Sequence, residues 1–92
     1  MSMIVKKDVI IGNKLGLHLR AAALFVKLSN KFKSDIFLQA DSNNANGKSI
    51  MSIMALAAGY GTKLKISAEG VDAKLAVEEL IKLVADKFGE KE

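Results

Sequence analysis

The segment Gly16-Leu17-His18-Leu19-Arg20-Ala21-Ala22 marks the point where a strand-like residue pattern gives way to a helix-like one. It contains the only histidine of the chain, and an arginine follows two residues later. A helix N-terminus carries unpaired backbone N–H groups and the positive end of the helix dipole, so it favours anions. We therefore interpret His18 as a candidate phosphoryl acceptor and Arg20 as a residue that stabilises the phosphate.

The apolar residues change their period across this segment. Residues 3–11 alternate, with Val5, Val9 and Ile11 on one face, which predicts a half-buried strand. Residues 19–32 place their apolar side chains at helical spacing, which predicts an amphipathic helix. The first part of the chain is thus expected to form a strand, a turn and a helix.

Three further strands are predicted downstream. Residues 36–40 and 62–68 alternate between apolar and polar side chains, as half-buried strands do. Residues 41–47 are polar and rich in asparagine, which favours a hairpin turn leading into a short, weak strand.

Two further helices complete the expected order of elements, β-α-β-β-α-β-α. One covers residues 49–57 with Ser49 as its N-cap, and the other runs from residue 73 to about residue 88. Residues 89–92 are expected to form a frayed tail. This order predicts one small α+β domain over residues 1–92, with helices packed on one face of a four-stranded sheet.

The composition excludes several classes of protein. The chain has 92 residues, half of them apolar, which suits a single folded domain. It has no cysteine, so a disulfide framework and a thiolate metal site are impossible. The N-terminus lacks the apolar core of a signal peptide, and the longest apolar run, residues 53–58, is too short to cross a bilayer. We expect a soluble, cytoplasmic protein.

The net charge of +4 requires that nucleic-acid binding be considered. The lysines, however, are spread along the whole chain, and one tyrosine without any tryptophan builds no platform for stacking bases. The same positive charge suits acidic protein partners. We therefore expect protein partners and no nucleic acid.

Simpler interpretations of His18 and Arg20 remain open. A lone histidine at a turn is most often a surface or capping residue, and Arg20 is then a solvated residue of the first helical turn. Phosphate binding is favoured because Gly16 permits a tight turn, because the helix begins at or just after His18, and because a guanidinium forks toward phosphate oxygens. A metal site needs several carboxylates nearby, and serine-nucleophile catalysis needs a third orienting group. No carboxylate lies near His18 in the sequence, so we expect no metal and no cofactor.

A second candidate site surrounds Ser49. Residues 46–49 resemble the end of a phosphate-binding loop, but Ser42 stands where that motif needs its first glycine. Ser49 is better interpreted as a helix N-cap, a place that also accommodates a phosphate on its hydroxyl. Ile50, Met51 and Met54 share one face of this helix. The sequence leaves open whether they form an exposed docking patch or belong to the core.

Three motifs, in this order and spacing, resemble those of the bacterial histidine-containing phosphocarrier family, the HPr family. Residues 16–20 match its phosphorylation motif G-[LI]-H-x-R, residues 48–51 its regulatory serine segment, and residues 66–70 the junction between a strand and its last helix. The resemblance covers nearly the whole chain. It implies an open-faced β-sandwich, in which three helices cover one face of a four-stranded antiparallel sheet of order 1-4-2-3.

The resemblance also implies a function in the phosphoenolpyruvate-dependent sugar phosphotransferase system. His18 would accept a phosphoryl group from enzyme I and pass it to enzyme II A-type domains, with Arg20 stabilising the phosphate. Ser49 corresponds to the serine that HPr kinase/phosphorylase modifies in many bacteria. The implied protein is a monomeric carrier with a covalent phosphohistidine, not a turnover enzyme, and it does not insert into membranes. Its implied partner-binding residues are Leu19, Ala23, Lys27, Lys48, Ile50, Met51 and Met54.

Two residues depart from the pattern of this family. Ala21 stands where proline usually follows the arginine, and Leu15 stands where a small polar residue usually precedes the histidine by three positions. Alanine retains helix propensity but constrains the first turn less than proline does. These departures raise an alternative, a nitrogen-related or regulatory phosphorelay protein that acts mainly through phospho-dependent partner binding.

Overall fold

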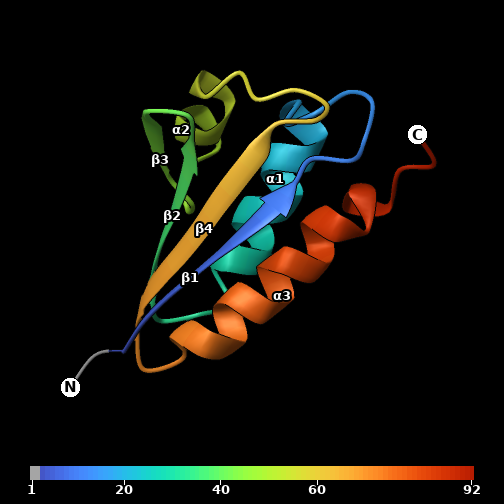
Figure 1. Ribbon diagram of the computed structural model, residues 1–92. Helices are drawn as coiled ribbons and strands as arrows, with labels where there is room; N and C mark the ends of the chain where they lie inside the picture. Colours follow the sequence, from blue (N-terminus) through green and yellow to red (C-terminus); the bar gives the residue numbers. More distant parts are fainter. Residues whose placement is uncertain (1–2) are drawn as a thin grey trace.

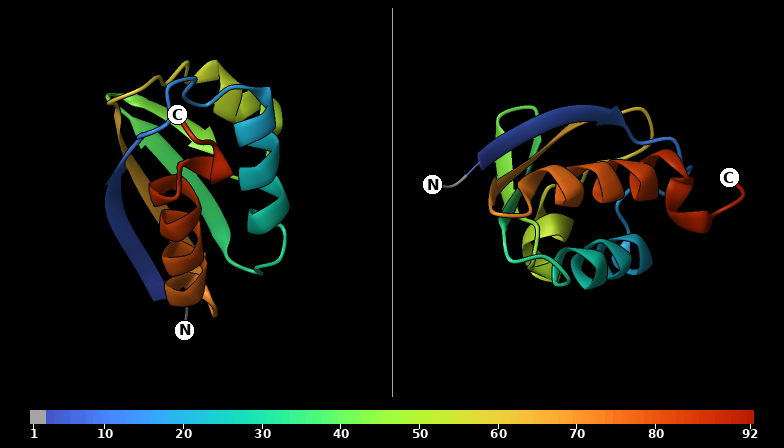
Figure 2. Two further views of the ribbon diagram at one scale, coloured as in Figure 1. Left: turned by 90° about the vertical axis from the view of Figure 1, so that its right-hand side faces the viewer. Right: turned by 90° about the horizontal axis from the view of Figure 1, so that it is seen from below.

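Four antiparallel strands form one sheet in the order β1-β4-β2-β3, and three α-helices cover one of its faces (Figure 1 and Figure 2). The computed structural model describes residues 3–92, and within them the predicted α+β architecture and strand order are confirmed. The elements are β1 (Met3–Ile10), α1 (Leu19–Ser29), β2 (Asp35–Ala40), β3 (Asn43–Asn46), α2 (Ile50–Ala55), β4 (Lys63–Gly70), α3 (Ala73–Ala85) and a short 3₁₀ helix, η1 (Lys87–Gly89).

Along the inner strand β4, apolar side chains that face the helices alternate with polar side chains that face away from them. Leu64 and Ile66 are fully buried, whereas Lys63 and Lys65 between them are exposed on the other face. Ile66 lies opposite Leu38 of β2, which is equally buried. Successive side chains of a strand point to opposite faces, so this register gives the sheet one apolar and one polar face.

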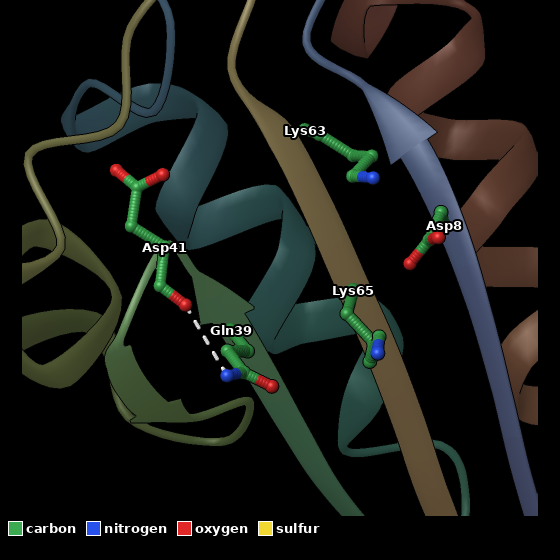
Figure 3. A pocket seen from close by; sticks show the side chains of 5 residues that line it. All are labelled: Asp8, Gln39, Asp41, Lys63 and Lys65. Carbon is green, nitrogen blue, oxygen red and sulfur yellow. Dashed lines mark hydrogen bonds between the residues drawn. The ribbon is translucent and has the colours of Figure 1, made fainter.

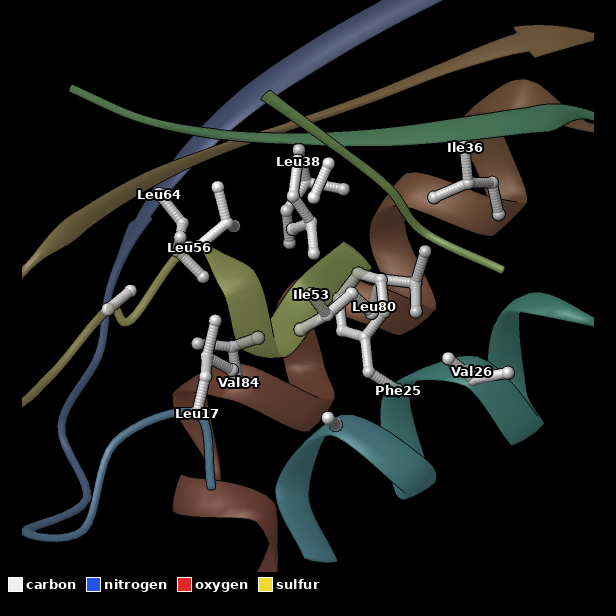
Figure 4. Packing of buried hydrophobic residues seen from close by; sticks show 14 of the residues in the cluster. Leu17, Phe25, Val26, Ile36, Leu38, Ile53, Leu56, Leu64, Leu80 and Val84 are labelled. Carbon is white, nitrogen blue, oxygen red and sulfur yellow. The ribbon is translucent and has the colours of Figure 1, made fainter. Parts of the chain in front are cut away.

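The core lies between the apolar face of the sheet and the helices (Figure 4). Phe25 of α1, Ile53 of α2 and Leu80 of α3 are fully buried and converge beneath Leu38. Burial of a large apolar side chain contributes roughly 1.5–3 kcal/mol, so these contacts hold all three helices on the sheet. On α2 it is Ile53 that enters the core, while Met51 is 78% exposed.

The first two helices are shorter than their periodicity predicts. α1 ends at Ser29, because the N–H groups of Lys31 and Phe32 bond to carbonyls three residues earlier, at 3.1 Å each, and tighten the chain into a turn. α2 begins after Ser49 and ends at Ala55, because Ala57 adopts a left-handed φ of 50°. The C-terminal ends of α1 and α2 are thus set by turns, which the spacing of apolar residues does not predict.

The C-terminal segment differs most from its prediction. α3 ends at Ala85, and Lys87, Phe88 and Gly89 adopt left-handed φ values of 57°, 55° and 76°. Two of these residues are not glycine, so the backbone conformation is unfavourable and needs compensation. Phe88, which is 1% exposed, supplies it by packing into the core. We expected residues 89–92 to fray, but Arg20, at the start of α1, bonds to the carbonyl of Phe88 and to the carboxylate of Glu90, and the chain runs on beyond the end of α3 (Figure 2).

The helix-free face of the sheet carries a shallow polar hollow (Figure 3). Within it the amide of Gln39 donates to the carbonyl of Asp41 at 3.2 Å, and Asp8 lies opposite Lys65 in the β1–β4 register. Its lining residues are Asp8, Gln39, Asp41, Lys63 and Lys65. Side chains of both charges lie together here, as they do on a solvated sheet surface, and residues 16–20 do not line this hollow.

The carboxylate of Asp72 ties the start of α3 to the loop before β2. It accepts hydrogen bonds from the Ser34 hydroxyl at 2.6 Å, the Ser34 N–H at 3.0 Å and the Lys33 N–H at 2.9 Å. The hydroxyl and the two N–H groups stabilise the ionised form, so the pKa of Asp72 lies below its ordinary value of 3.8.

Asp72→Asn is expected to lower the unfolding temperature at neutral pH. The depressed pKa means that the native state binds fewer protons than the unfolded chain, so the stabilisation is complete above pH 3.8 and is lost as the pH falls through the native pKa. The difference in unfolding temperature between wild type and variant should therefore shrink in that acid range. Asp35→Asn, at an exposed position of β2, is the control for loss of charge. If the difference in unfolding temperature between wild type and Asp72→Asn stayed constant with pH, the ionised carboxylate of Asp72 would not be its cause.

Candidate functional site

His18 is the N-cap of α1, so the helix begins just after it, as the sequence predicted. Its backbone is extended (φ −74°, ψ 177°), and its carbonyl accepts the N–H of Ala22 at 2.9 Å. The imidazole makes no capping hydrogen bond, and the side chain is 28% exposed. The ring is thus accessible from solvent at the positive end of a helix of 11 residues.

A tightly held loop sets the position of His18. Gly16 adopts a left-handed φ of 67°, and the N–H of Leu17 donates to the carbonyl of Ala58 at 2.9 Å. The fully buried Asn13 donates from its side-chain amide to the carbonyl of Gly16 at 2.9 Å. These bonds join the end of β1, the loop before β4 and the start of α1 directly beneath the histidine.

Glu90 completes the site, although it lies 72 positions from His18 in the sequence. One carboxylate oxygen, Oε2, lies 2.5 Å from His18 Nε2 and accepts from Arg20 Nη1 at 3.0 Å. The other, Oε1, accepts from the amide of Asn13 at 3.0 Å. Arg20 Nη1 also donates to the carbonyl of Phe88 at 3.1 Å. Sequence patterns missed Glu90, and the one available signal was the apolar Phe88, which directly precedes the residues expected to fray.

The environment of Glu90 determines its ionisation. Partial burial raises the pKa of Glu90, but hydrogen bonds from His18 and Asn13 and the positive charges of His18 and Arg20 outweigh that effect. The pKa consequently lies below its ordinary value, and Glu90 is a carboxylate at neutral pH. An ionised carboxylate only accepts hydrogen bonds.

His18, Arg20 and Glu90 line an open depression at this end of the molecule. Lys14 and Lys91 add positive charge to its lining, Glu92 adds negative charge, and Leu15 adds an apolar side chain that is 68% exposed. Leu15 is one of the two departures from the family pattern, and it lies on the surface beside the histidine. The other, Ala21, is fully buried.

Ser49 caps α2, which confirms the N-cap interpretation. Its hydroxyl oxygen accepts the N–H of Ser52 at 3.2 Å, and its backbone is extended (φ −127°, ψ 115°). The neighbouring Lys48 does not extend freely into solvent, because its ammonium donates to the carbonyl of Phe32 at 2.8 Å. Lys48 therefore links the start of α2 to the end of α1.

The residues assigned to partner binding lie on or beside α1 and α2, which pack against each other. The three residues of α2 that the sequence left open are divided, because Met51 and Met54 are exposed (78% and 38%) while Ile50 is partly buried against the core. Leu19 is 60% exposed beside the histidine. Of the remaining assigned residues, Lys27 is exposed, whereas Ala23, Lys48 and Ile50 are half-buried.

Residues 3–92 contain no group of three or more side chains arranged to hold a metal ion. Over the same residues, no helix is long and apolar enough to cross a membrane.

Comparison with known proteins agrees with this geometry. The family described as "PTS HPr component phosphorylation site" matches residues 5–86. The phosphocarrier protein HPr of Cupriavidus necator is 39% identical, over 96% of this chain and 99% of its own length. The HPr-like protein Crh of Bacillus subtilis is 42% identical, over 90% of this chain and 98% of its own length.

Solved structures support the same assignment. The crystal structure of HPr-C-His from Thermoanaerobacter tengcongensis has a TM-score of 0.91 and 44% sequence identity, and the match covers 96% of this chain and 99% of that one. The family match, the full-length relatives and the shared fold lead to one conclusion. This chain belongs to the HPr phosphocarrier family of the phosphotransferase system.

Proposed function

We propose that His18 accepts a phosphoenolpyruvate-derived phosphoryl group from enzyme I and passes it to enzyme II A-type domains during sugar uptake. The observation that carries this proposal is the accessible imidazole at the N-terminus of α1, with Arg20 beside it. Nε2 of the ring is engaged by Glu90, and Nδ1 has no hydrogen-bond partner among residues 3–92. Nδ1 is therefore the proposed site of phosphorylation, in a carrier that acts as a cytoplasmic monomer.

Arg20 and the start of α1 supply the positive groups that a phosphohistidine needs. Arg20 Nη1 already binds Glu90 and Phe88, but within the described chain the other guanidinium nitrogens make no hydrogen bond. These nitrogens can donate to phosphate oxygens while Nη1 stays in place. The unpaired N–H groups of the first helical turn add to this attraction. A phosphate on His18 would thus be held by Arg20 and α1 together.

The exposed residues of α1 and α2 suit the docking of partner proteins. Leu19, Met51 and Met54 offer apolar area, and methionine adapts its shape to different surfaces. Lys27 adds a positive charge on α1, which favours acidic partners. The proposed carrier would therefore meet enzyme I and the enzyme II A-type domains through one surface formed by α1 and α2.

A phosphotransfer assay tests the proposed function directly. The full-length chain is incubated with enzyme I and phosphoenolpyruvate, and the product is analysed by intact mass and by acid treatment. One phosphate that is lost in acid supports a phosphohistidine. No incorporation, with a known HPr labelled in parallel, would refute the proposal.

We further propose that an HPr kinase/phosphorylase regulates the carrier at Ser49. The hydroxyl caps α2 beside the exposed Met51 and Met54, so a phosphate there would place negative charge on the docking surface. Acidic partners would bind such a surface more weakly.

Ser49→Asp is expected to weaken binding to enzyme I while leaving α2 intact. Aspartate is as good an N-cap as serine, so the variant adds charge without removing the cap. Ser49→Asn, an equally good but neutral cap, is the matched control and should bind like wild type. We expect a loss of roughly tenfold in affinity by calorimetry, the order of one unfavourable charge contact. Equal binding of both variants would argue against regulation by charge.

A regulatory or nitrogen-related phosphorelay protein is the second candidate. Two observations favour it, the exposed Leu15 beside His18 and the relatives that are named HPr-like protein Crh. This alternative predicts ATP-dependent, acid-stable phosphate on Ser49 and a phospho-form with altered partner binding. Labelling that persists in Ser49→Ala would count against it. Efficient transfer from phosphorylated His18 to a sugar-specific enzyme II A domain would favour the carrier in sugar uptake.

A further inference from the structure

Both oxygens of the Glu90 carboxylate accept hydrogen bonds from residues other than the histidine. Asn13, which is fully buried, donates to Oε1, and Arg20 donates to Oε2. The buried Phe88 anchors the chain two residues earlier. These contacts therefore fix the position of the Glu90 carboxylate at His18 Nε2.

This contact determines which nitrogen of the ring carries the proton. Glu90 is ionised at neutral pH and can only accept, so His18 Nε2 must donate across the 2.5 Å separation. A neutral imidazole has one N–H, so Nδ1 then carries the free lone pair. Carboxylates that bind the far nitrogen of a reactive histidine orient the ring and select its tautomer in the same way.

Resting on the phosphocarrier function proposed above, we propose that Glu90 is a positioning residue for phosphotransfer. It keeps the proton of His18 on Nε2, so that Nδ1 is the nucleophile, and it stabilises the positive charge that the ring acquires when Nδ1 is phosphorylated.

The transfer step balances without any movement of this proton. The lone pair of Nδ1 attacks phosphorus, the Nδ1–P bond forms, and the bond from phosphorus to the donor group of enzyme I breaks with its electron pair leaving on that donor. The phosphorylated ring, still protonated at Nε2, is positively charged and faces the carboxylate of Glu90. In the onward step the electrons of the Nδ1–P bond return to Nδ1, and Nε2 keeps its proton.

The full-length chain allows this arrangement to be observed directly, because His18 is the only histidine. In ring-¹⁵N-labelled protein, at a pH where the ring is neutral, we expect a protonated Nε2 with a far-downfield, slowly exchanging proton and an unprotonated Nδ1. Glu90→Ala should lose the downfield proton. Glu90→Gln, which keeps an acceptor oxygen but no charge, should retain the tautomer with a less shifted proton.

Phosphotransfer kinetics separate the positioning role from a structural one. At saturating enzyme I, Glu90→Ala should accept phosphate at least about tenfold more slowly, as expected for loss of a charge-assisted hydrogen bond, and Glu90→Gln should fall between it and wild type. Glu69→Gln, an exposed carboxylate on β4, controls for net charge. Thermal unfolding measured on each variant shows whether a slower rate accompanies a loss of the fold.

The outcomes distinguish this inference from the proposed function. If wild type accepts phosphate on His18 and Glu90→Ala does so at the same rate, the inference is wrong and the carrier function stands. The inference would also be wrong if Nε2 of the neutral His18 ring were unprotonated in the wild-type protein. If wild-type His18 accepts no phosphate, the proposed function fails, and the role of Glu90 in phosphotransfer fails with it.

Discussion

His18→Ala is expected to abolish acid-labile phosphate incorporation from enzyme I and phosphoenolpyruvate. Alanine has no nucleophilic nitrogen, and the chain has no second histidine that could take over. We therefore expect no acid-labile phosphate on the variant at all, and not merely slower incorporation. Intact mass spectrometry of the reacted chain, before and after acid treatment, measures it.

The same substitution should leave the fold intact, which makes the result interpretable. The imidazole makes no capping hydrogen bond and is partly exposed, so its loss creates no cavity in the core. The cost in stability is confined to the bond with Glu90. Arg20→Lys is the graded comparison, because a lysine keeps the charge but loses the forked donors, so it should slow phosphate acceptance without preventing it. Phosphate on His18→Ala at the wild-type level would exclude His18 as the acceptor.

The elements that the sequence predicted correctly are those with a regular apolar period. The alternation of Leu64 and Ile66 on β4 and the helical spacing of Phe25 on α1 both depend on which side of the element meets the core. That information is local, because one face of each element is apolar along its whole length. The position of His18 at the start of α1 followed from the same change of period.

The contact between Glu90 and His18 depends on information of another kind. It requires three successive left-handed residues after α3, and two of them, Lys87 and Phe88, are residue types that rarely adopt that conformation. Their conformation is maintained by the burial of Phe88 against residues far away in the sequence. Local propensity therefore predicted a longer helix and a frayed tail, and it concealed the carboxylate that bonds to His18.

The two faces of α2 were ambiguous for a related reason. In a helix of six residues, Ile53 and Met51 are both apolar, and their order along the chain does not tell which of them meets the sheet. The register of the whole domain decides it, since Ile53 packs beneath Leu38 and Met51 turns outward. Tertiary packing thus separated a core residue from a candidate docking residue.

Gly16→Ala is expected to destabilise the protein by about 2–5 kcal/mol and to disturb the loop beneath His18. A left-handed φ of 67° costs an alanine about 1–2 kcal/mol. Its Cβ would also lie 2.6 Å from the carbonyl oxygen of Ala58 and 2.7 Å from the Cα of Gly59, backbone atoms that cannot rotate away, and such overpacking costs about 1–3 kcal/mol. Domains of this size have a total stability of about 5–15 kcal/mol, so the midpoint of urea unfolding should fall markedly.

Two other glycines separate the two causes of that loss. Gly61 has a left-handed φ of 85° but open space around its Cβ position, so Gly61→Ala should cost only the conformational part, about 1–2 kcal/mol. Gly59 has open space and no left-handed φ, so Gly59→Ala should be nearly neutral. The order Gly16, Gly61, Gly59 in loss of stability follows from backbone geometry alone. If Gly16→Ala were no worse than Gly61→Ala, the close approach of the loops beneath His18 would be wrong, and with it the rigid placement of the imidazole at the start of α1.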